Sequence, residues 1–443
     1  MNGTRIAPGP RGKLLLGNLP AFRGDVLKLM LDSAKEFGDV VRFRLGPLTV
    51  HLLNHPDFVE HVLQSGSRNY DKATRSSGKI RLISGDSLLV SNGEVWKRQR
   101  RLMQPTFHRQ RIARLANEMI GLTAEMLESW RARIATDQTL DVASEMMRLT
   151  YRIVGKTLLG VDVAGDSAAI EHAMETILAH AYRGWGSIVA LPPSFPTLAN
   201  LRFRRALHVV DDVVRRIIAK QRTGKAAADN LLSMLLEVRD EDGQGLSDAE
   251  LRNETVTFLL AGHETTANAL AWTFYLLSQN PNAEEQLRGE LCQVLGGRPP
   301  GVEDLPRLSY TNMVIQEGMR LYPAIWAMER RAIANDVIGG FHIPAGSSVV
   351  ISPYVLHRHE SFWPNPEQFE PARFSVRHKA YIPFGSGPRF CIGNEFAMME
   401  ARLIIPMVIQ ACQLKVAPGH VVEPLPGITL RPKNGLPMIV QPV

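Results

Sequence analysis

A single long helix is the feature of this sequence that most constrains what the chain can fold into. Ser247 and Glu250 have the spacing of a capping box, in which each side chain bonds to the backbone of the other residue. The helix that they start is expected to end at Asn280, because Pro281 has no amide hydrogen with which to continue it. Residues 258–277 are apolar on most sides of this helix. A helix of about 32 residues with that composition is expected to cross the interior of a large domain.

The other patterns predict a mainly α-helical (α+β) fold with small β-sheets. Val40–Leu45 and Thr49–Asn54 are rich in strand-forming residues and flank a Gly-Pro pair, so they predict a hairpin. Ser309–Leu321 predicts a helix that ends before a Tyr-Pro pair. A further hairpin is expected around Asn434 and Gly435, since this dipeptide is typical of tight turns between strands.

The composition is that of a globular enzyme. The 443 residues are 45% hydrophobic, enough for a large buried core. Neither a repeat nor a linker divides residues 1–443, so we expect a single domain. The formal net charge of +7 is compatible with an acidic protein partner, a nucleic acid or an anionic membrane. No motif supports nucleic-acid binding, and no stretch reaches the roughly 18 apolar residues that span a bilayer.

The cysteines and the start of the chain indicate the compartment. Three scattered cysteines are too few for a disulfide framework or for a zinc site with paired ligands. They are Cys292, Cys391 and Cys412. The first residues contain neither a secretory signal nor a transit-peptide pattern. We therefore expect a cytoplasmic protein without a membrane span.

The segment Phe384–Gly393, FGSGPRFCIG, is the clearest candidate for chemistry. Its three glycines and one proline bend the backbone around Cys391, and a helix-like sequence begins directly afterwards. A lone cysteine is usually a small buried hydrophobe. Here the start of a helix and the nearby Arg389 are expected to lower the pKa of the thiol. No second cysteine or histidine lies nearby to complete a zinc site, whereas one anionic sulfur suits a haem iron.

A polar run, AGHETT at residues 261–266, interrupts the long apolar helix. Each residue alone has a structural explanation, because a threonine inside a helix usually bonds to a carbonyl of the preceding turn. Together, Gly262 and Thr265 predict a local bulge or kink in the helix. Such a bulge would hold dioxygen and ordered water.

Two further pairs of residues have both a structural and a functional interpretation. Trp96 and Arg100 lie one helical turn apart in a stretch, 96–114, with seven Lys or Arg and no Asp or Glu. Either this stretch is a solvated basic helix, or Trp96 and Arg100 bind the anionic edge of a cofactor. In the second case the neighbouring cations would face an acidic protein partner: Lys97, Arg98 and Arg101.

The second pair is Glu317 and Arg320, spaced i to i+3. Such pairs are common on helix surfaces and contribute little to stability, so the pair is interpreted as structural. Arg373, in the sequence PARF, is expected to complete a network with it.

Together, these residues resemble the cytochrome P-450 family. Residues 384–393 match the haem-loop pattern F-x-x-G-x-R-x-C-x-G in full, and residues 261–266 match the oxygen-binding pattern A-G-x-[DE]-T-[TS]. Residues 317–320 match E-x-x-R, and residues 96–100 match W-x-x-x-R. The motifs stand in family order and span nearly the whole chain. The family often has P-E-R-F where this sequence has PARF, but the arginine is kept.

The resemblance implies a triangular, helix-rich fold with haem b buried between the long helix and the helix after Cys391. Cys391 would be the proximal ligand of the iron, while Glu317, Arg320 and Arg373 would form a structural triad. The remaining cofactor contacts implied are Trp96, Arg100, Ala261, Arg330, Phe384, Gly385, Arg389, Ile392 and Gly393. Arg331 is the alternative to Arg330 as a ligand of a haem propionate.

The resemblance also implies the reaction. A cytochrome P-450 is a monooxygenase that inserts one oxygen atom of dioxygen into an apolar substrate, by hydroxylation or epoxidation. Thr265 would orient protons for this reaction, with Glu264 and water as the relay. Because the chain ends soon after the last expected hairpin, electrons are expected from NAD(P)H through a separate ferredoxin or flavodoxin with its reductase.

The substrate is less constrained. The implied pocket is mostly apolar, and its lining residues are Leu88, Leu89, Phe258, Ala261, Thr265, Ile325, Trp326 and Leu436. An apolar ligand is therefore expected, with terpenoids, fatty acids, steroids and macrolides all left open. Trp326 would form a bulky ceiling, although core packing explains a tryptophan there equally well.

Three other functions are alternatives to this one. A haem-thiolate isomerase or dehydratase needs no reductase, and a peroxide-driven hydroxylase usually lacks an acid–alcohol pair. Glu264 and Thr265 argue against both. A haem-dependent gas sensor should lack oxygen-activating residues or carry an output module, and neither holds for this sequence.

Overall fold

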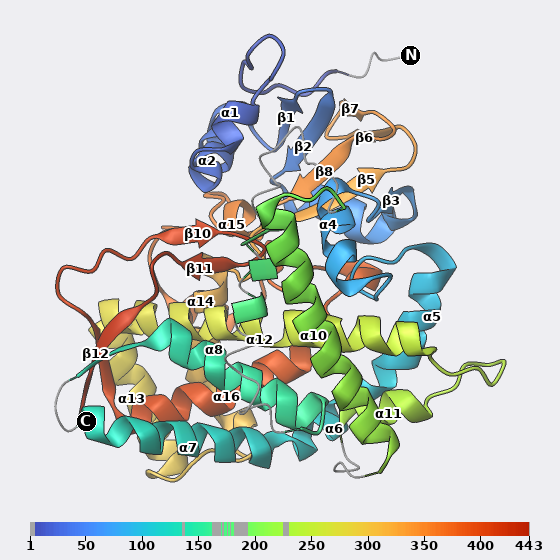
Figure 1. Cartoon of the computed structure of the whole chain (residues 1–443). Coiled ribbons are helices and arrows are strands. Elements are labelled where there is room, and N and C mark those ends of the chain that lie inside the picture. The colour runs from blue at the N-terminus through green and yellow to red at the C-terminus, as the bar shows by residue number, and fades with distance from the viewer. Residues whose placement is uncertain are drawn as a thin grey trace.

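The computed structural model describes residues 5–134, 138–161, 170, 172–174, 176–177, 179–180, 194–224 and 230–442. Helices form most of the molecule, and a β-rich part lies at one end of it (Figure 1). This confirms the predicted mainly helical fold with small sheets.

The main helices follow one another along the described part of the chain. They are α1 (Leu19–Phe22), α2 (Val26–Phe37), α3 (Pro56–Glu60), α4 (Arg75–Ser84), α5 (Gly93–Met103), α6 (Arg109–Arg114), α7 (Ala116–Ile134), α8 (Val142–Ile153), α10 (Leu198–Arg222), α11 (Leu231–Glu237), α12 (Asp248–Gln279), α13 (Pro281–Leu295), α14 (Ser309–Leu321), α15 (Pro353–Leu356) and α16 (Asn394–Ala411).

The strands lie mostly near the two ends of the chain. They are β1 (Val40–Leu45), β2 (Leu48–Leu53), β3 (Tyr70–Asp71), β4 (Thr139–Asp141), β5 (Met328–Ala332), β6 (Asp336–Ile338), β7 (Phe341–Ile343), β8 (Ser348–Ile351), β9 (Gln413–Val416), β10 (Pro424–Pro426), β11 (Leu430–Pro432) and β12 (Pro437–Gln441).

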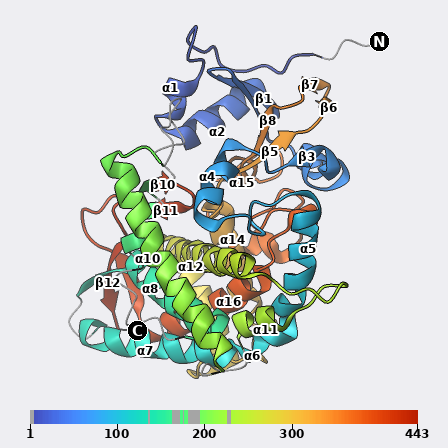
Figure 2. The same ribbon diagram turned by 45° about the vertical axis from the view of Figure 1, so that its right-hand side comes forward.

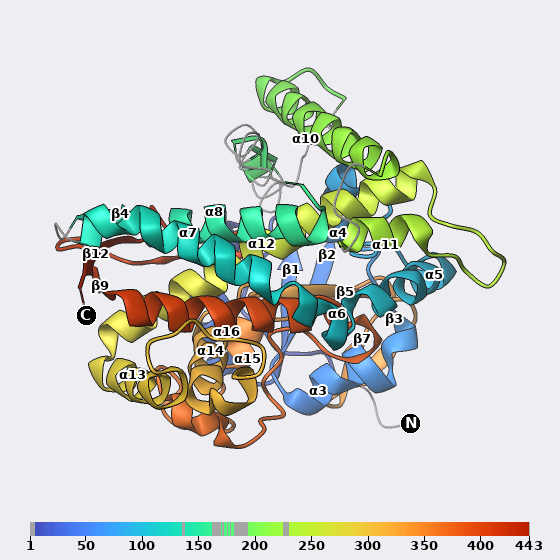
Figure 3. The same ribbon diagram turned by 90° about the horizontal axis from the view of Figure 1, so that it is seen from below.

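Helix α12 is the long helix that the sequence predicts. The capping box is formed as expected, because the Ser247 hydroxyl accepts from the Glu250 amide and the Glu250 carboxylate accepts from the Ser247 amide. The helix ends at Asn280, and Pro281 begins α13. Helices α8, α10, α14 and α16 pack against it. Seen from below, α7, α8, α12 and α16 run close together (Figure 3), and the largest hydrophobic core lies among them.

A five-stranded sheet with the order β1-β2-β8-β5-β3 forms the other end of the molecule. The predicted hairpin is confirmed as the antiparallel pair β1–β2, although β2 begins one residue earlier than expected, at Leu48. Strand β8 pairs with β2 in parallel and with β5 in antiparallel fashion. Helices α1 and α2 lie beside this sheet (Figure 2), where a separate apolar cluster forms around Phe43 and Trp326.

The hairpin expected around Asn434 and Gly435 is wrong. Both residues have positive φ angles, 64° and 78°, so the turn itself exists. The strands on its two sides do not pair with each other, however: β11 pairs with β10, while β12 pairs with β4 and β9. The turn therefore passes the chain from one sheet to another.

The bulge expected in the middle of α12 is also absent. Residues 248–279, all of which the structure describes, are α-helical throughout. Thr265 donates its hydroxyl proton to the carbonyl of Ala261 at 2.7 Å, which is the ordinary bond of a helical threonine. Gly262 instead allows close packing, because a Cβ atom there would lie 3.0 Å from Cγ2 of Val154. Among the helices of the described residues, none combines the length and the apolar character that crossing a bilayer requires.

Candidate active site

Cys391 lies in the short connection that leads into α16. Its amide donates to the carbonyl of Phe384 at 3.0 Å, which closes the loop before the helix. The loop is sterically specified at Gly387, whose φ is +67° and whose Cβ, if present, would lie 1.9 Å from the carbonyl oxygen of Leu63. The backbone amide of Gly393 points at the Cys391 sulfur. The thiol therefore sits at the start of a helix, as the sequence predicts.

The electrostatics of the thiol differ from the expectation. Burial raises the pKa of the Cys391 thiol above its ordinary value, while the Gly393 amide, Arg100 and Lys72 act in the opposite direction. The expected lowering of this pKa is thus wrong, because desolvation of the thiolate outweighs the helix terminus and the nearby cations. The side chain nevertheless keeps accessible surface although protein surrounds it.

Two arginines lie beside this loop. Arg100, on α5, donates to the carbonyl of Phe390 at 3.0 Å. Arg389 donates from Nη2 to the carbonyl of Ser91 at 2.8 Å, and its Cζ lies 4.1 Å from the centre of the Trp96 ring. Its Nη1 atom is buried and has no hydrogen-bond partner among the described residues. Burial, followed by the repulsion of neighbouring cations, lowers the pKa of Arg389 to about 9.

Two further cations complete a positive cluster, in which Arg330 is buried and the other members are half-buried. Arg330, on β5, is buried and donates to the carbonyl of its neighbour Glu329. Burial lowers its pKa to about 10. Lys72 donates to the carbonyl of Leu89 at 2.7 Å, and burial together with the charges of Arg330 and Arg389 holds its pKa well below the usual range. The positive charges of these residues act on one another although they come from distant parts of the chain.

Arg331, the alternative to Arg330 as a ligand of a haem propionate, has a different environment. It donates to both carboxylate oxygens of Asp71, at 3.1 and 2.6 Å, and its side chain is partly exposed. Its charge is therefore already paired, whereas Arg330 is turned into the cluster.

The polar run of α12 divides between two environments. Ala261 is exposed and Thr265 is half-buried, although much of the helix around them is buried. The Glu264 side chain is buried and accepts a hydrogen bond from Thr429 at 2.6 Å. Burial raises the pKa of Glu264. His263 is buried in the helix core, where desolvation lowers its pKa to about 4.

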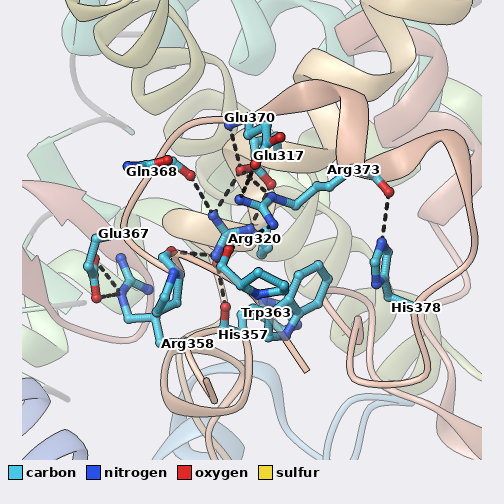
Figure 4. A network of polar contacts seen from close by, with 12 residues as sticks. Glu317, Arg320, His357, Arg358, Trp363, Glu367, Gln368, Glu370, Arg373 and His378 are labelled. Carbon is cyan, nitrogen blue, oxygen red and sulfur yellow. Dashed lines mark hydrogen bonds and ion pairs between the residues drawn. The ribbon is translucent and has the colours of Figure 1, made fainter. Parts of the chain in front are cut away.

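Glu317 and Arg320 form a fully buried ion pair within α14, beside the loop that precedes the cysteine segment (Figure 4). The Glu317 carboxylate accepts from Arg320 Nε and Nη2 at 2.6 and 2.8 Å and from Arg373 Nε at 3.0 Å. Arg320 also donates to three backbone carbonyls, those of His357, Pro366 and Gln368. The network therefore fixes the loop of residues 357–373 to α14.

Comparison with known proteins identifies the family. The model of the cytochrome P450 family matches residues 7–437. The chain belongs to the cytochrome P450 family. It is thus a haem b monooxygenase that uses dioxygen, receives electrons originating in NAD(P)H through a separate redox partner, and acts on an apolar substrate.

Bacterial enzymes are among its relatives. Cyclooctatin synthase of Streptomyces melanosporofaciens is 37% identical over 99% of this chain and 95% of that protein. Cyclooctat-9-en-7-ol 5-monooxygenase of the same organism is 36% identical over 94% of this chain and 90% of that protein. Pentalenene oxygenase of Streptomyces avermitilis is 34% identical over 89% of this chain and 88% of that protein.

The residues of this cytochrome P450 fit a haem. Lys72, Arg100, Arg330 and Arg389 bring cations together in the interior, and burying such charges without an anion is unfavourable. The unpartnered Nη1 of Arg389 shows that the cluster can make further hydrogen bonds. Two propionates would supply both the anions and the acceptors. The thiol of Cys391 beside the same cluster offers the single sulfur ligand that an iron requires.

Three of the expected pocket residues lie in the hydrophobic core. Trp326 donates from Nε1 to the carbonyl of Gly427 at 2.9 Å and packs beside the five-stranded sheet. Of the two interpretations of this tryptophan, a pocket ceiling or core packing, its position fits core packing. Leu436 and Phe258 are buried in the helical core. The other apolar candidates, Leu88, Leu89 and Ile325, are half-buried and keep some accessible surface.

The basic neighbours of Trp96 do not all face outward. Each bonds an acidic side chain of this same chain: Lys97 bonds Glu94, Arg98 bonds Asp240 and Glu250, and Arg101 bonds Glu241. The expectation that Arg98 faces an acidic partner is therefore wrong, because the loop before α12 lies against α5 and neutralises it.

Two residues of this region were missed by the sequence analysis. Lys72 stands in no recognisable motif, and only the pairing of β3 with β5 brings it beside Arg330. Thr429 lies 165 residues from Glu264 in the sequence. A motif search has no local signal for either residue.

Proposed function

We propose that Cys391 would supply the thiolate ligand of the haem in this cytochrome P450 and that the substrate is a terpenoid. The observation that carries the first part is the position of the thiol, at the start of α16 and beside the cluster of four cations. A metal-bound sulfur is deprotonated by the metal itself, so the raised pKa of the thiol does not oppose this role.

The four cations would hold the haem propionates. Arg330 is preferred over Arg331, since Arg331 is already paired with Asp71. Arg100 and Arg389 would reach the same edge, with Trp96 stacked on Arg389. The backbone and apolar contacts would come from Ala261 on α12 and from the loop residues Phe384, Gly385, Ile392 and Gly393. When bound, the haem activates dioxygen, and its thiolate ligand favours cleavage of the O–O bond.

Thr265 and Glu264 would deliver protons to the reaction through water. The hydroxyl of Thr265 donates to Ala261, so its lone pairs are left to accept a hydrogen bond from water. Glu264 is buried, and burial raises the pKa of its carboxyl above the ordinary value, which favours the protonated form. A carboxylic acid that releases its proton to water beside Thr265 would act as the general acid.

The terpenoid proposal is supported by the relatives and by the side chains. Two of the relatives act, by their names, on cyclooctat-9-en-7-ol and on pentalenene. The half-buried pocket candidates Leu88, Leu89 and Ile325 are apolar. A small polycyclic hydrocarbon or alcohol would bury its surface against such side chains without an unpaired charge.

A spectrum of the reduced, carbon-monoxide-bound protein tests the ligand. Thiolate ligation predicts a strongly red-shifted Soret band, and Cys391→His should remove it. Cys292→Ser is the matched control, because Cys292 is an exposed cysteine of α13. A red-shifted band that survives in Cys391→His, or a histidine-like band in the parent protein, would contradict the assignment.

A binding screen tests the substrate class. Polycyclic terpene hydrocarbons and alcohols should displace the water ligand and shift the Soret band, whereas fatty acids and steroids of equal size should do so at higher concentrations. Tighter binding of a fatty acid than of any terpenoid would contradict the proposal.

Residues 1–443 would form one catalytic domain, which the family match over residues 7–437 supports. Thr265 and the half-buried pocket residues Leu88, Leu89 and Ile325 would be its substrate-facing part. A cytoplasmic location is supported by the three free cysteines. Fractionation of the native host, with the carbon monoxide spectrum as the readout, tests the location.

A further inference from the structure

The turn that joins β10 to β11 is firmly attached to the rest of the molecule. Trp326 donates to the carbonyl of Gly427 at 2.9 Å, and Trp272 of α12 donates to the carbonyl of Leu430 at 3.0 Å. The amide of Leu430 donates to the carbonyl of Ala324 at 2.9 Å. These bonds fix both ends of the turn, so the residue between them, Thr429, has a defined position.

Thr429 uses its hydroxyl in both directions. It donates to Oε1 of Glu264 at 2.6 Å and accepts from Nδ2 of Asn268 at 3.0 Å. All three side chains are buried. Glu264 and Asn268 are four residues apart on α12, so they present one face of the helix to the turn.

This hydroxyl is the only side-chain hydrogen-bond partner of Glu264 within the described residues. No hydrogen bond joins Glu264 to Thr265 there, and Thr265 instead bonds to Ala261. Of the charged groups, Arg431 on β11 acts on the Glu264 carboxyl, whereas His263 beside it is directed at Leu259. The orientation of Glu264 is therefore set from the hairpin and not from its neighbour on the helix.

We propose that Thr429 is a positioning residue for proton delivery, whose hydroxyl, oriented by Asn268 and by the anchored turn, holds the carboxyl of Glu264 in one orientation. The proposal rests on the proposed role of Glu264 as a proton donor. Because Oε1 accepts from Thr429, the acid proton stands on Oε2. On delivery, the Oε2–H bond breaks, water takes the proton, and the carboxylate keeps its bond to Thr429. Solvent water returns the proton.

The hydrogen bond from Thr429 changes the pKa of Glu264, which a contact with only a structural role would not do. A hydroxyl that donates to a carboxyl stabilises the ionised form, and Thr429 lowers the pKa of Glu264 against the larger effect of burial. Without the hydroxyl, Glu264 should ionise at higher pH and lose its fixed orientation.

The first test reads Glu264 directly in the resting, haem-loaded enzyme. The infrared band of the protonated Glu264 carboxyl is isolated as the difference between the parent protein and Glu264→Gln. In Thr429→Val the band should titrate at higher pH and move to higher frequency, while Thr429→Ser should restore both. Thr255→Val is the matched control, because Thr255 is equally buried on α12 but donates to the carbonyl of Leu251.

An unchanged titration and band frequency in Thr429→Val would overturn the proposal. A lower melting temperature with an unchanged band would show a structural role alone, and it would also overturn the proposal.

The second test uses turnover. Thr429→Val should divert a severalfold larger share of the consumed NAD(P)H to hydrogen peroxide, and the pH at which this share changes should rise. In a Glu264→Gln background the same substitution should add nothing. A further increase in that background would overturn the proposal, because Thr429 would then act without Glu264.

The two tests separate this inference from the function on which it rests. If Glu264→Gln leaves the peroxide share unchanged, Glu264 is not the proton donor, and the proposed function fails at that point. The infrared titration would still report whether Thr429 sets the orientation of Glu264.

Discussion

The guanidinium of Arg389 lies over the ring of Trp96, with its Cζ 4.1 Å from the centre of the ring. The two residues come from opposite ends of the chain, one from α5 and one from the loop before Cys391. The contact leaves Nη2 bonded to the carbonyl of Ser91 and the oxygen of Asn92, and Nη1 buried without a partner among the described residues. A cation held by an aromatic face on one side can bind an anion on the other.

Trp96→Leu should therefore weaken haem retention. A cation–π contact that is partly shielded from water contributes about 1–2 kcal/mol, so haem should leave the variant about 5 to 30 times faster. The rate of haem transfer to an excess of apomyoglobin measures this. Trp96→Phe should retain part of the effect, because its ring also offers a negative face. Equal rates for the Leu variant and the parent protein would show that the stacking does not support the haem.

Arg330→Ala and Arg331→Ala form a matched pair of neighbours on one strand. Arg330 is buried in the cation cluster, and hydrogen bonds to charged groups contribute about 1.5–3 kcal/mol, so its loss should reduce haem affinity at least tenfold. Arg331 is partly exposed and paired with Asp71, and its loss should change haem affinity less than twofold. Haem content after purification and the transfer rate report both. The reverse order would assign the propionate to Arg331.

Local signals explain how much of the fold could be predicted. The capping box and Pro281 set both ends of α12, and the Tyr-Pro pair set the end of α14, because these effects act within one or two turns of chain. The turn at Asn434 and Gly435 was also recognised correctly. Which strands the turn joins depends on partners hundreds of residues away, so the expected hairpin was wrong.

In the candidate site, too, the residues of local motifs could be predicted, whereas residues that come from distant parts of the chain could not. The haem-loop segment around Cys391 is contiguous in sequence and was recognised. Lys72 and Thr429 lie outside any motif and reach the site only through sheet pairing. The sequence around Arg98 does not predict its ion pairs with Asp240 and Glu250, because both acidic residues are distant from it along the chain. Burial, which raises the pKa of the Cys391 thiol, is a property of the folded chain that spacing cannot give.

Glu317→Gln should destabilise the protein strongly. The substitution removes the charge that Arg320 and Arg373 share, and breaking a fully buried pair costs about 3–5 kcal/mol because a guanidinium stays buried without its anion. The expected result is a lower urea midpoint or little folded protein. Glu423→Gln is the control, since the side chains of Glu423 and its partner Lys433 are 54% and 49% exposed. It should cost about 0–1 kcal/mol. Similar losses for both variants would contradict the central role of Glu317.

Glu254 should make the stability of this enzyme fall as the pH rises. Its Oε1 accepts from the amide of Leu88 at 2.8 Å, and its Oε2 is buried with no partner among the described residues. Burial raises the pKa of Glu254 to about 8. Between the ordinary pKa of 4.5 and about 8 the folded protein keeps a proton that the unfolded chain releases. The free energy of unfolding should then drop by about 1.4 kcal/mol per pH unit across this window from this group alone.

Glu254→Gln isolates this effect, because glutamine resembles the protonated acid and stays neutral at every pH. The variant should match the parent protein near pH 5 and become progressively more stable than it as the pH rises toward 8, since only the parent must bury a group that prefers to ionise. Urea unfolding at several pH values measures the difference. Glu285→Gln, on the exposed side of α13, should follow the parent curve throughout. A constant offset between Glu254→Gln and the parent protein across this range would mean that Glu254 is ionised in the fold and that Leu88 holds a carboxylate.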